Sequence, residues 1–132
     1  MNAHPSVLTV GAVRADGLPL ALSSQGPGRL APALQNTPSY DDAFHKPDLC
    51  APSHFREGDD ASEVNTGTSA ACGFAAGIVA ALRSVPAGRV LKPEELRDKL
   101  RKSAQPVGDA GWNPRLGFGV IDAAAALTMI EQ

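Results

Sequence analysis

The feature that most constrains the fold is a segment of small and apolar residues that runs from residue 69 to about residue 84. A helix that is apolar on all sides is buried on all sides, whereas a surface helix keeps one polar face. Three larger side chains recur four residues apart along one face of the predicted helix: Phe74, Ile78 and Leu82. Alanine and glycine occupy most of the other positions and let neighbouring backbone come close. The sequence therefore predicts a tightly packed, buried helix that needs covering partners.

Two segments upstream of this helix predict strands. Residues 7–13 are a nearly continuous run of β-branched and aliphatic residues, which is typical of a central parallel strand covered on both faces. Residues 49–51, between Pro47 and Pro52, predict a short buried strand. Shorter predicted features are a turn at residues 16–17, an extended piece at residues 20–22 and a polar hairpin at residues 55–64.

Two more helices are predicted downstream. The first covers residues 93 to about 103, with Pro93 in its first turn and with Leu96 and Leu100 facing inward. Its charged side chains are expected on a solvated face, in pairs three or four residues apart: Glu94, Glu95, Asp98, Lys99, Arg101 and Lys102. The second covers residues 123 to about 131. It is expected to be capped by Asp122 and to bury Ala123, Leu127 and Ile130.

Size and charge exclude several classes of protein. A chain of 132 residues fits one domain, residues 1–132, and 43% apolar with 20% charged residues is a globular balance. The net charge of -2 is too weak and too mixed to favour nucleic acid or an anionic membrane surface. The longest apolar stretch, residues 70–82, is shorter than the ~20 residues of a membrane-spanning helix. We therefore expect neither a nucleic-acid partner nor a membrane partner.

A hydroxyl at the start of the buried helix is the strongest candidate for chemistry. Gly67 and Thr68 precede Ser69, and the glycine permits a sharp turn into the helix. Free N–H groups and the positive end of the helix dipole favour an alkoxide-like nucleophile and the oxyanion that follows its attack on a carbonyl. The alternative is that Thr68 or Ser69 only caps the helix. The triplet alone favours that alternative, so the surrounding sequence must decide.

The surrounding sequence resembles the subtilisin-like serine proteases. Residues 67–77 (GTSAACGFAAG) are similar to the nucleophile segment of that family, G-T-S-x-A-x-P-x-V-A-G. Four other segments match family motifs in the same order along the chain: residues 4–13 (HPSVLTVGAV), 23–27 (SSQGP), 46–52 (KPDLCAP) and 117–123 (GFGVIDA). The resemblance implies an α/β fold of three layers with a mainly parallel sheet, of which this chain would be the C-terminal portion, incomplete on its own.

The resemblance also implies roles for individual residues. Ser69 would be the nucleophile that is acylated, and its own backbone N–H would contribute to the oxyanion hole. Gly67 and Thr68 would shape the turn. Residues near the substrate pocket would be Ala51, Pro52 and Ser53, and Ser53 stands where the family usually has glycine. Two further departures are Gly73 in place of the family's proline and Phe74 where histidine is common.

The partners that a serine nucleophile needs are not recognisable in the sequence. The family motifs D-[ST]-G and H-G-T, which carry its aspartate and histidine, are absent. The oxyanion asparagine is also missing, because Asn2 is too close to Pro5. His4 is expected in a surface or packing role, His45 lies in the predicted surface loop before residue 46, and His54 is the one base within the chain that could still serve. We therefore expect a serine endopeptidase half that acts on polypeptides only with its upstream half; the alternative is a non-catalytic remnant or interaction module.

Cofactor sites are weakly indicated. No metal or other cofactor is expected, and calcium, which some subtilisin-like proteins bind, is only an alternative. The spacing of the candidate calcium ligands does not fit an EF-hand, and a solvated acidic loop is the favoured interpretation. These candidates are Asp41, Asp42, Asp48, Asp59 and Asp60. Cys50 and Cys72 match no zinc spacing. A disulfide between them is one possibility, and two buried free thiols are the favoured one.

Overall fold

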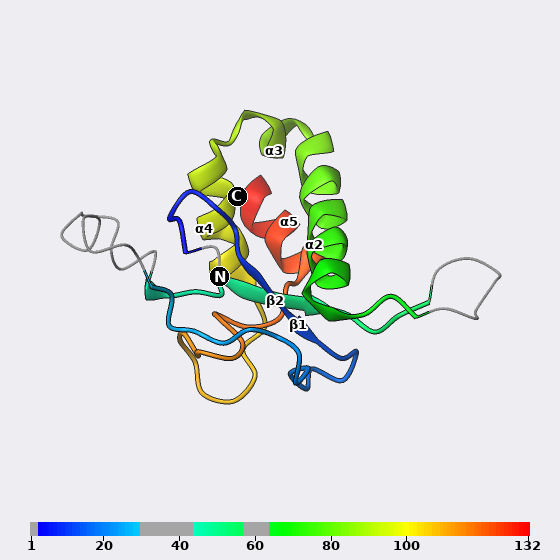
Figure 1. Ribbon diagram of the computed structural model, residues 1–132. Helices are drawn as coiled ribbons and strands as arrows, with labels where there is room; N and C mark the ends of the chain where they lie inside the picture. The colour runs from blue at the N-terminus through cyan, green and yellow to red at the C-terminus, as the bar shows by residue number, and fades with distance from the viewer. Residues whose placement is uncertain (1–2, 30–43, 57–63) are drawn as a thin grey trace.

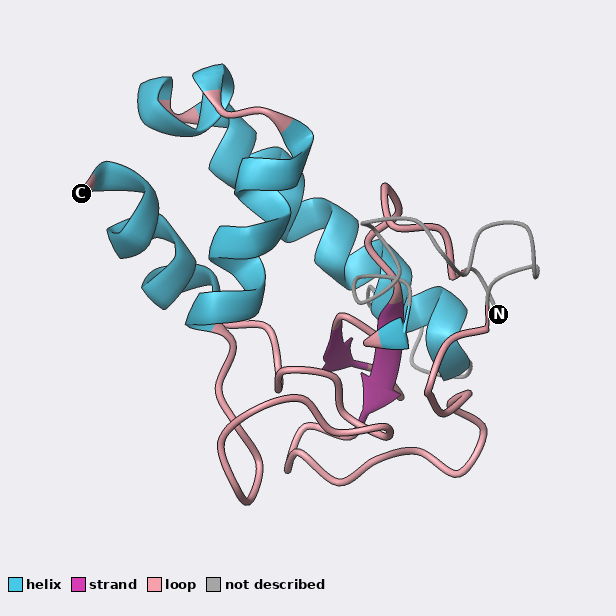
Figure 2. Ribbon diagram, turned by 90° about the vertical axis from the view of Figure 1, so that its left-hand side faces the viewer, coloured by secondary structure: helices cyan, strands magenta, loops and turns pink. Residues whose placement is uncertain are grey.

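The helices lie on one side of a pair of parallel strands, together with the N-terminal segment that runs beside α4, and much of the irregular chain lies on the other side (Figures 1 and 2). The computed structural model describes residues 3–29, 44–56 and 64–132. The elements are strands β1 (Val10–Val13) and β2 (Leu49–Pro52) and helices α2 (Gly67–Ser84), α3 (Pro86–Val90), α4 (Pro93–Ser103) and α5 (Ala123–Glu131). None of the helices in this described part is long and apolar enough to cross a membrane.

The two strands confirm the predicted parallel sheet. Val10 of β1 pairs with Leu49 of β2, and the register continues to the end of both strands. On its other edge β2 exchanges two hydrogen bonds with the chain near Val120: the Cys50 N–H donates to the Gly119 carbonyl, and its carbonyl accepts from the Ile121 N–H, both at 2.8 Å. β2 therefore lies between β1 and the C-terminal segment. The run that predicted a strand over residues 7–13 is a regular strand only in its second half.

The outer edge of β1 is covered in part by the chain itself. The Ala12 carbonyl accepts from the Leu20 N–H at 3.0 Å, and the Ala12 N–H donates to the Ser23 hydroxyl at 3.0 Å. The prediction of an extended piece at residues 20–22 is wrong, because the Ser23 N–H donates back to the Leu20 carbonyl and closes a turn. Leu22 at the tip of that turn is exposed.

Helix α2 packs on both strands but only through one face (Figure 1). Ala71, Ala75 and Leu82 are buried, whereas Phe74 is 42% exposed. The other exposed positions on the helix are also small or apolar: Cys72, Gly73, Ala76, Gly77, Ala80 and Ala81. The prediction that this helix is buried on all sides is wrong for the described part of the chain. Composition makes the second face apolar, but no described segment covers it.

Helices α4 and α5 pack against each other and confirm most of what was predicted for them. Leu96 and Leu100 of α4 are buried. The carboxylate of Asp122 accepts a hydrogen bond from the Ala125 N–H at 2.9 Å and so caps α5. The buried positions of α5 are Ala126 and Ile130, while Leu127 is half-buried and the predicted Ala123 is exposed. The buried face therefore begins in the second turn of α5.

Three charged side chains form a buried network that ties α4 to the strands. Lys46 and Asp48 are fully buried, and the Lys46 ammonium donates to Asp48 Oδ2 at 2.7 Å and to the Val7 carbonyl at 2.6 Å. Arg101 Nε donates to Asp48 Oδ1 at 2.8 Å, and its guanidinium lies 5.5 Å from the ring centre of Phe118. Burial lowers the pKa of Lys46, and the hydrogen bond that Lys46 donates to Asp48 opposes that effect.

The network corrects the prediction of a solvated charged face on α4. Arg101 is largely buried against Asp48 instead of facing water. Lys99 Nζ donates to the Met129 carbonyl at 2.5 Å and so satisfies an acceptor near the end of α5. Both side chains leave the surface of their own helix to reach acceptors elsewhere, which local pairing along one helix cannot predict.

Candidate active site

The turn that leads into α2 places Ser69 at the surface. Thr66 is the N-cap with extended backbone, and Gly67 follows at φ +79°. That left-handed conformation is accessible to glycine at little cost and is strained for other residues. Ser69 is the third residue of the helix and is exposed. The first N–H groups of a helix have no acceptor within it, so this turn presents both a hydroxyl and free donors.

A ladder of three contacts holds this turn to the segment that follows β2. The two segments run antiparallel, and each of three successive residues on one side contacts one on the other. The contacts are the Ser53 hydroxyl donating to the Gly67 carbonyl at 2.8 Å, His54 Nδ1 at 3.5 Å from Thr66 Oγ1, and reciprocal backbone hydrogen bonds between Phe55 and Asn65 at 3.0 and 2.8 Å. We call these six residues the turn ladder. They form the base of the predicted hairpin, whose residues 57–63 lie outside the described residues.

Two hollows open on either side of Ser69. One, of about 390 Å³, runs from Ser69 to the rings of Phe55 and Phe74, whose centres are 6.2 Å apart. The other, of about 560 Å³, is bordered by residues 7–10 and by Cys72 and Ala76 of α2. Both walls are mainly apolar. Ser69 therefore borders both hollows.

No hydrogen bond joins Ser69 to a histidine within the described residues. His4 accepts from the Ser6 N–H at 3.2 Å. The ring of His45 lies 5.0 Å from that of Trp112, in an aromatic group with Phe44 and Phe118. His54, the one candidate base, faces Thr66 in the turn ladder and has φ +64°. Among the described residues, the turn that carries Ser69 is therefore formed without a histidine hydrogen-bonded to the serine.

The residues predicted near the substrate pocket occupy the end of β2. Ala51 is fully buried beneath α2, Pro52 is half-buried, and Ser53 is 2% exposed. That they border a substrate pocket stays a prediction. Sequence reasoning missed the hydrogen bond from Ser53 to Gly67. The signal that could have found it is a hydroxyl at a position where the family usually has no side chain.

The two cysteines are free and have different environments. Cys50 is fully buried in β2, and burial raises the pKa of its thiol to about 12. Cys72 is exposed on α2, one helical turn after Ser69. The alternative of a disulfide between them is not realised, and the prediction that both thiols are buried is wrong for Cys72. Its exposure has the same cause as that of Phe74, namely the uncovered second face of α2.

The calcium alternative gains no support from the one candidate ligand that the structure describes. Asp48 is fully buried, and its oxygens already accept hydrogen bonds from Lys46, Arg101 and the Thr9 N–H. The other candidate ligands lie outside the described residues: Asp41, Asp42, Asp59 and Asp60. Within the described residues, no group of three or more histidine, cysteine or acidic side chains could hold a metal ion.

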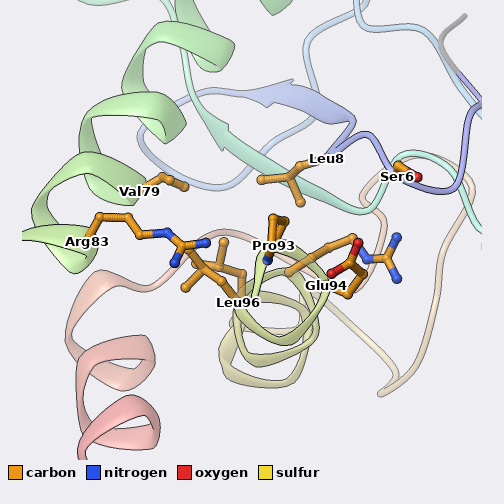
Figure 3. Close-up of a pocket in the computed structure, with 9 residues that line it drawn as sticks. Ser6, Leu8, Val79, Arg83, Pro93, Glu94 and Leu96 are labelled. Carbon is orange, nitrogen blue, oxygen red and sulfur yellow. The ribbon is translucent and has the colours of Figure 1, made fainter. Parts of the chain in front are cut away.

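A third hollow, of about 170 Å³, lies between residues 6–8, α2 and α4 (Figure 3). Figure 3 shows Arg83 and Glu94 on opposite sides of it. Arg83 sits about 20 Å along α2 from Ser69, at ~1.5 Å per residue. Its guanidinium donates to the carbonyls of Gly88 and Leu91 and so holds α3 in place. This hollow is therefore remote from the turn that carries Ser69, and the Arg83 guanidinium at its border has a structural role.

The structure thus places an exposed serine in the first turn of a helix that packs on two parallel strands. The model of the subtilase family matches residues 2–119. The chain belongs to the subtilase family, as the five sequence motifs predict. Comparison with curated protein sequences gave no match.

Solved structures of proteases share the fold. The Patellamide maturation protease PatA is 26% identical, with a TM-score of 0.70 over 98% of this chain and 44% of its own. The Prenylagaramide maturation protease PagA is also 26% identical, with a TM-score of 0.70 over 97% of this chain and 43% of its own. MycP1 from Mycobacterium smegmatis, 22% identical, has a TM-score of 0.67 over 92% of this chain and 29% of its own. The chain thus spans less than half the length of these proteases.

Proposed function

We propose that this chain provides the nucleophile of a subtilisin-like serine endopeptidase. The observation that carries the proposal is the nucleophile turn: Ser69 is exposed in the first turn of α2, directly after Gly67 at φ +79° and Thr68. In the reaction, Ser69 Oγ attacks the scissile carbonyl carbon while its proton passes to a base. The C–N bond then breaks, the amine leaves with that proton, and water hydrolyses the resulting ester.

The base, its carboxylate partner and a second oxyanion donor are proposed to come from an upstream half of the catalytic domain. The sequence contains neither D-[ST]-G nor H-G-T, and Asn2 lies outside the described residues. One oxyanion donor alone contributes about 2.7 to 4 kcal/mol of transition-state stabilisation. Losing it together with the histidine and the aspartate would leave almost no turnover. On this proposal the chain is inactive by itself and active when the upstream half is bound.

The surface that would receive the upstream half is proposed to be the uncovered face of α2 together with the adjoining part of β1. Phe74 is 42% exposed there, and small residues follow it along the helix. A hollow of about 480 Å³ between this face and Leu127 of α5 is almost entirely apolar. Burial of such a surface is favourable at about 25 cal/mol for each Å² removed from water, so a covering segment would be held without charged contacts.

The substrate is proposed to be a polypeptide. Ser69 lies between two mainly apolar hollows, which suits an extended chain that continues on both sides of the scissile bond. PatA and PagA, which share the fold, are maturation proteases. Which peptide bond this chain would act on is decided by side chains on both halves of the cleft.

Labelling with a fluorophosphonate probe tests the proposal. The folded chain alone is expected to stay unlabelled, and labelling is expected to appear after addition of a polypeptide that carries the D-[ST]-G and H-G-T motifs. Ser69→Ala should abolish that labelling, and circular dichroism should confirm that both proteins are folded. Labelling of the chain alone would mean that a base such as His54 works within it. No labelling with any complementing half would contradict the proposal.

A second candidate function is a non-catalytic interaction module that keeps the packing of this half of the fold. The observation that favours it is the isolation of Ser69, which makes no hydrogen bond with any histidine in the described part of the chain. Under this alternative the apolar face of α2 is the functional surface. Ser69→Ala would then leave partner binding unchanged, whereas Phe74→Ser would weaken it.

A further inference from the structure

The turn ladder joins the nucleophile turn to a residue that has no counterpart side chain in the family pattern. Ser53 is 2% exposed, and its hydroxyl donates to the Gly67 carbonyl at 2.8 Å. Where glycine occupies this position, no side chain can make that bond. The bond is therefore a property of this chain and not of the motif, and it ends two residues before Ser69.

The Gly67 carbonyl is a sensitive place for such a contact. In regular helical geometry it accepts from the N–H of Ala71, so the Ser53 hydroxyl is a second donor to the same oxygen. Gly67 itself has φ +79° and meets no neighbouring atom within 4 Å of where a β-carbon would lie. A side chain at this position would therefore meet open space, so no side-chain packing contributes to holding Gly67 in place. The hydrogen bond from Ser53 fixes the orientation of the peptide group between Gly67 and Thr68.

The rest of the turn ladder supports the same restraint from the other side. His54 contacts the Thr66 hydroxyl, and Phe55 and Asn65 exchange two backbone hydrogen bonds. Only the contact from Ser53 reaches past the N-cap into the helix itself. It therefore acts directly on the turn that carries Ser69, whereas the other contacts act on the approach to that turn.

We infer that Ser53 is a positioning residue for the nucleophile: its hydroxyl holds the first turn of α2 in the conformation that directs Ser69 and its backbone N–H toward a substrate carbonyl. The catalytic part of this inference, an effect on acylation of Ser69, rests on the proposed function. The structural part, restraint of the turn by the Ser53 hydroxyl, can be measured on this chain alone. Precise placement of reacting groups is worth large factors in rate, so loosening of this turn should slow acylation.

The first measurement is amide hydrogen exchange in the chain as it exists. Ser53→Ala and Ser53→Gly should each speed exchange of the Ala70 and Ala71 amides by about tenfold, the factor that a single hydrogen bond of ordinary strength represents. Exchange in α4 and α5 should stay unchanged. Ser103→Ala is the matched control, because Ser103 is also a buried serine whose hydroxyl donates to a helical carbonyl, that of Leu100.

The second measurement is the rate of fluorophosphonate labelling of Ser69 in the complemented enzyme. Ser53→Ala and Ser53→Gly should lower the maximal labelling rate by about tenfold with little change in the probe concentration that gives half of that rate, and Ser53→Thr, which keeps a hydroxyl, should restore much of the rate. Unchanged exchange at Ala70 and Ala71 in both hydroxyl-free variants would overturn the inference, as would labelling at the unaltered rate. If the wild-type complex itself fails to label, the proposed function fails, and the exchange data alone decide whether Ser53 restrains the turn.

Discussion

Two regions of this molecule, one around α4 and one around the start of α2, differ in which side chains they bury. Around α4, three charged side chains are buried together, and Lys46, Asp48 and Arg101 satisfy one another. Around the start of α2, apolar side chains and Ser69 are exposed, and Phe74 is 42% exposed. Polar groups are inside at one end and apolar groups outside at the other. Each arrangement reverses the usual preference, so each needs a specific explanation.

The difference shows which part of the chain is self-sufficient. Within the described residues, Lys46, Asp48 and Arg101 of the buried network find their charged partners in one another. By contrast, no described segment of the chain covers the exposed apolar face of α2. A region whose contacts are all internal should lose stability when altered, whereas a region prepared for an outside partner should tolerate changes until that partner binds. The four predictions below test this contrast.

The largest expected effect is at the buried network. Asp48→Ala removes the acceptor of both Lys46 and Arg101 and leaves a fully buried ammonium without its counter-charge. We expect a loss of about 3 to 5 kcal/mol in the free energy of unfolding, measured by urea denaturation. Arg14→Ala is the control, since its ion pair with Asp16 is exposed and should cost less than about 1 kcal/mol. Equal costs for the two variants would remove the contrast.

A matched pair of apolar truncations compares the two regions directly. Leu100 of α4 is 1% exposed, so Leu100→Ala should lower the free energy of unfolding by about 2 to 5 kcal/mol. Phe74 of α2 is 42% exposed, so Phe74→Ala should cost about 1 kcal/mol or less despite removing a larger side chain. A large cost at Phe74 in the same denaturation experiment would mean that its face is covered in solution, for example by a second copy.

The pH dependence of stability should reveal the buried thiol. Burial raises the pKa of Cys50 from 9.0 to about 12, so the unfolded chain releases this proton at a lower pH than the folded chain does. Unfolding therefore becomes more favourable as the pH rises above 9, by about 2 to 3 kcal/mol at about pH 11. Lys46, whose pKa is lowered, changes stability in the opposite direction. Its contribution cancels when wild type and Cys50→Ala are compared at each pH by denaturation.

That comparison has a clear negative outcome. If wild type and Cys50→Ala lose stability in parallel above pH 9, the folded thiol is not protected, and β2 is less well covered than its burial indicates. Reaction with a thiol reagent at neutral pH is an independent check. Cys72 should react in the folded chain, and Cys50 should react only after unfolding, because only Cys72 is exposed.

The smallest expected effect is at the cap of α5. The Asp122 carboxylate accepts from the Ala125 N–H at 2.9 Å and from the Gln105 side chain at 2.7 Å. These bonds lower its pKa, so its contribution is present above the ordinary value of 3.8 and is lost as the pH falls through the folded pKa. Asp122→Ala should cost about 0.5 to 2 kcal/mol at neutral pH, measured by thermal unfolding. Asp122→Asn should retain most of the cap at that pH but lose the acid dependence.

Much of the fold was predictable from local signals. Helix α4 begins at Pro93 as predicted, because proline suits the first position of a helix, and α5 begins after its capping aspartate. The parallel strands followed from runs of aliphatic residues. These features depend on residues within a few positions of one another. The family motifs, which span almost the whole chain, also identified Ser69 as the candidate nucleophile.

The parts that were not predictable depend on residues far apart in the sequence. Arg101 pairs with Asp48 across 53 positions, and nothing near Arg101 distinguishes it from the solvated charges beside it. Ser53 reaches Gly67 across 14 positions, through backbone turns that the residue types alone do not specify. The exposure of one α2 face had a different origin. Composition shows that a face is apolar, but it does not show whether the same chain covers it.

Because of the turn ladder, the position of Ser69 does not depend on how many residues lie between Phe55 and Asn65. The two sides of the turn ladder fix the chain at Phe55 and again at Asn65, so the path into α2 is set before and after the intervening residues. Closing a loop of twice the length costs only about 0.6 kcal/mol more. Insertions between these two points can therefore accumulate during divergence, or be engineered as reporter peptides, while the nucleophile stays in register with β2.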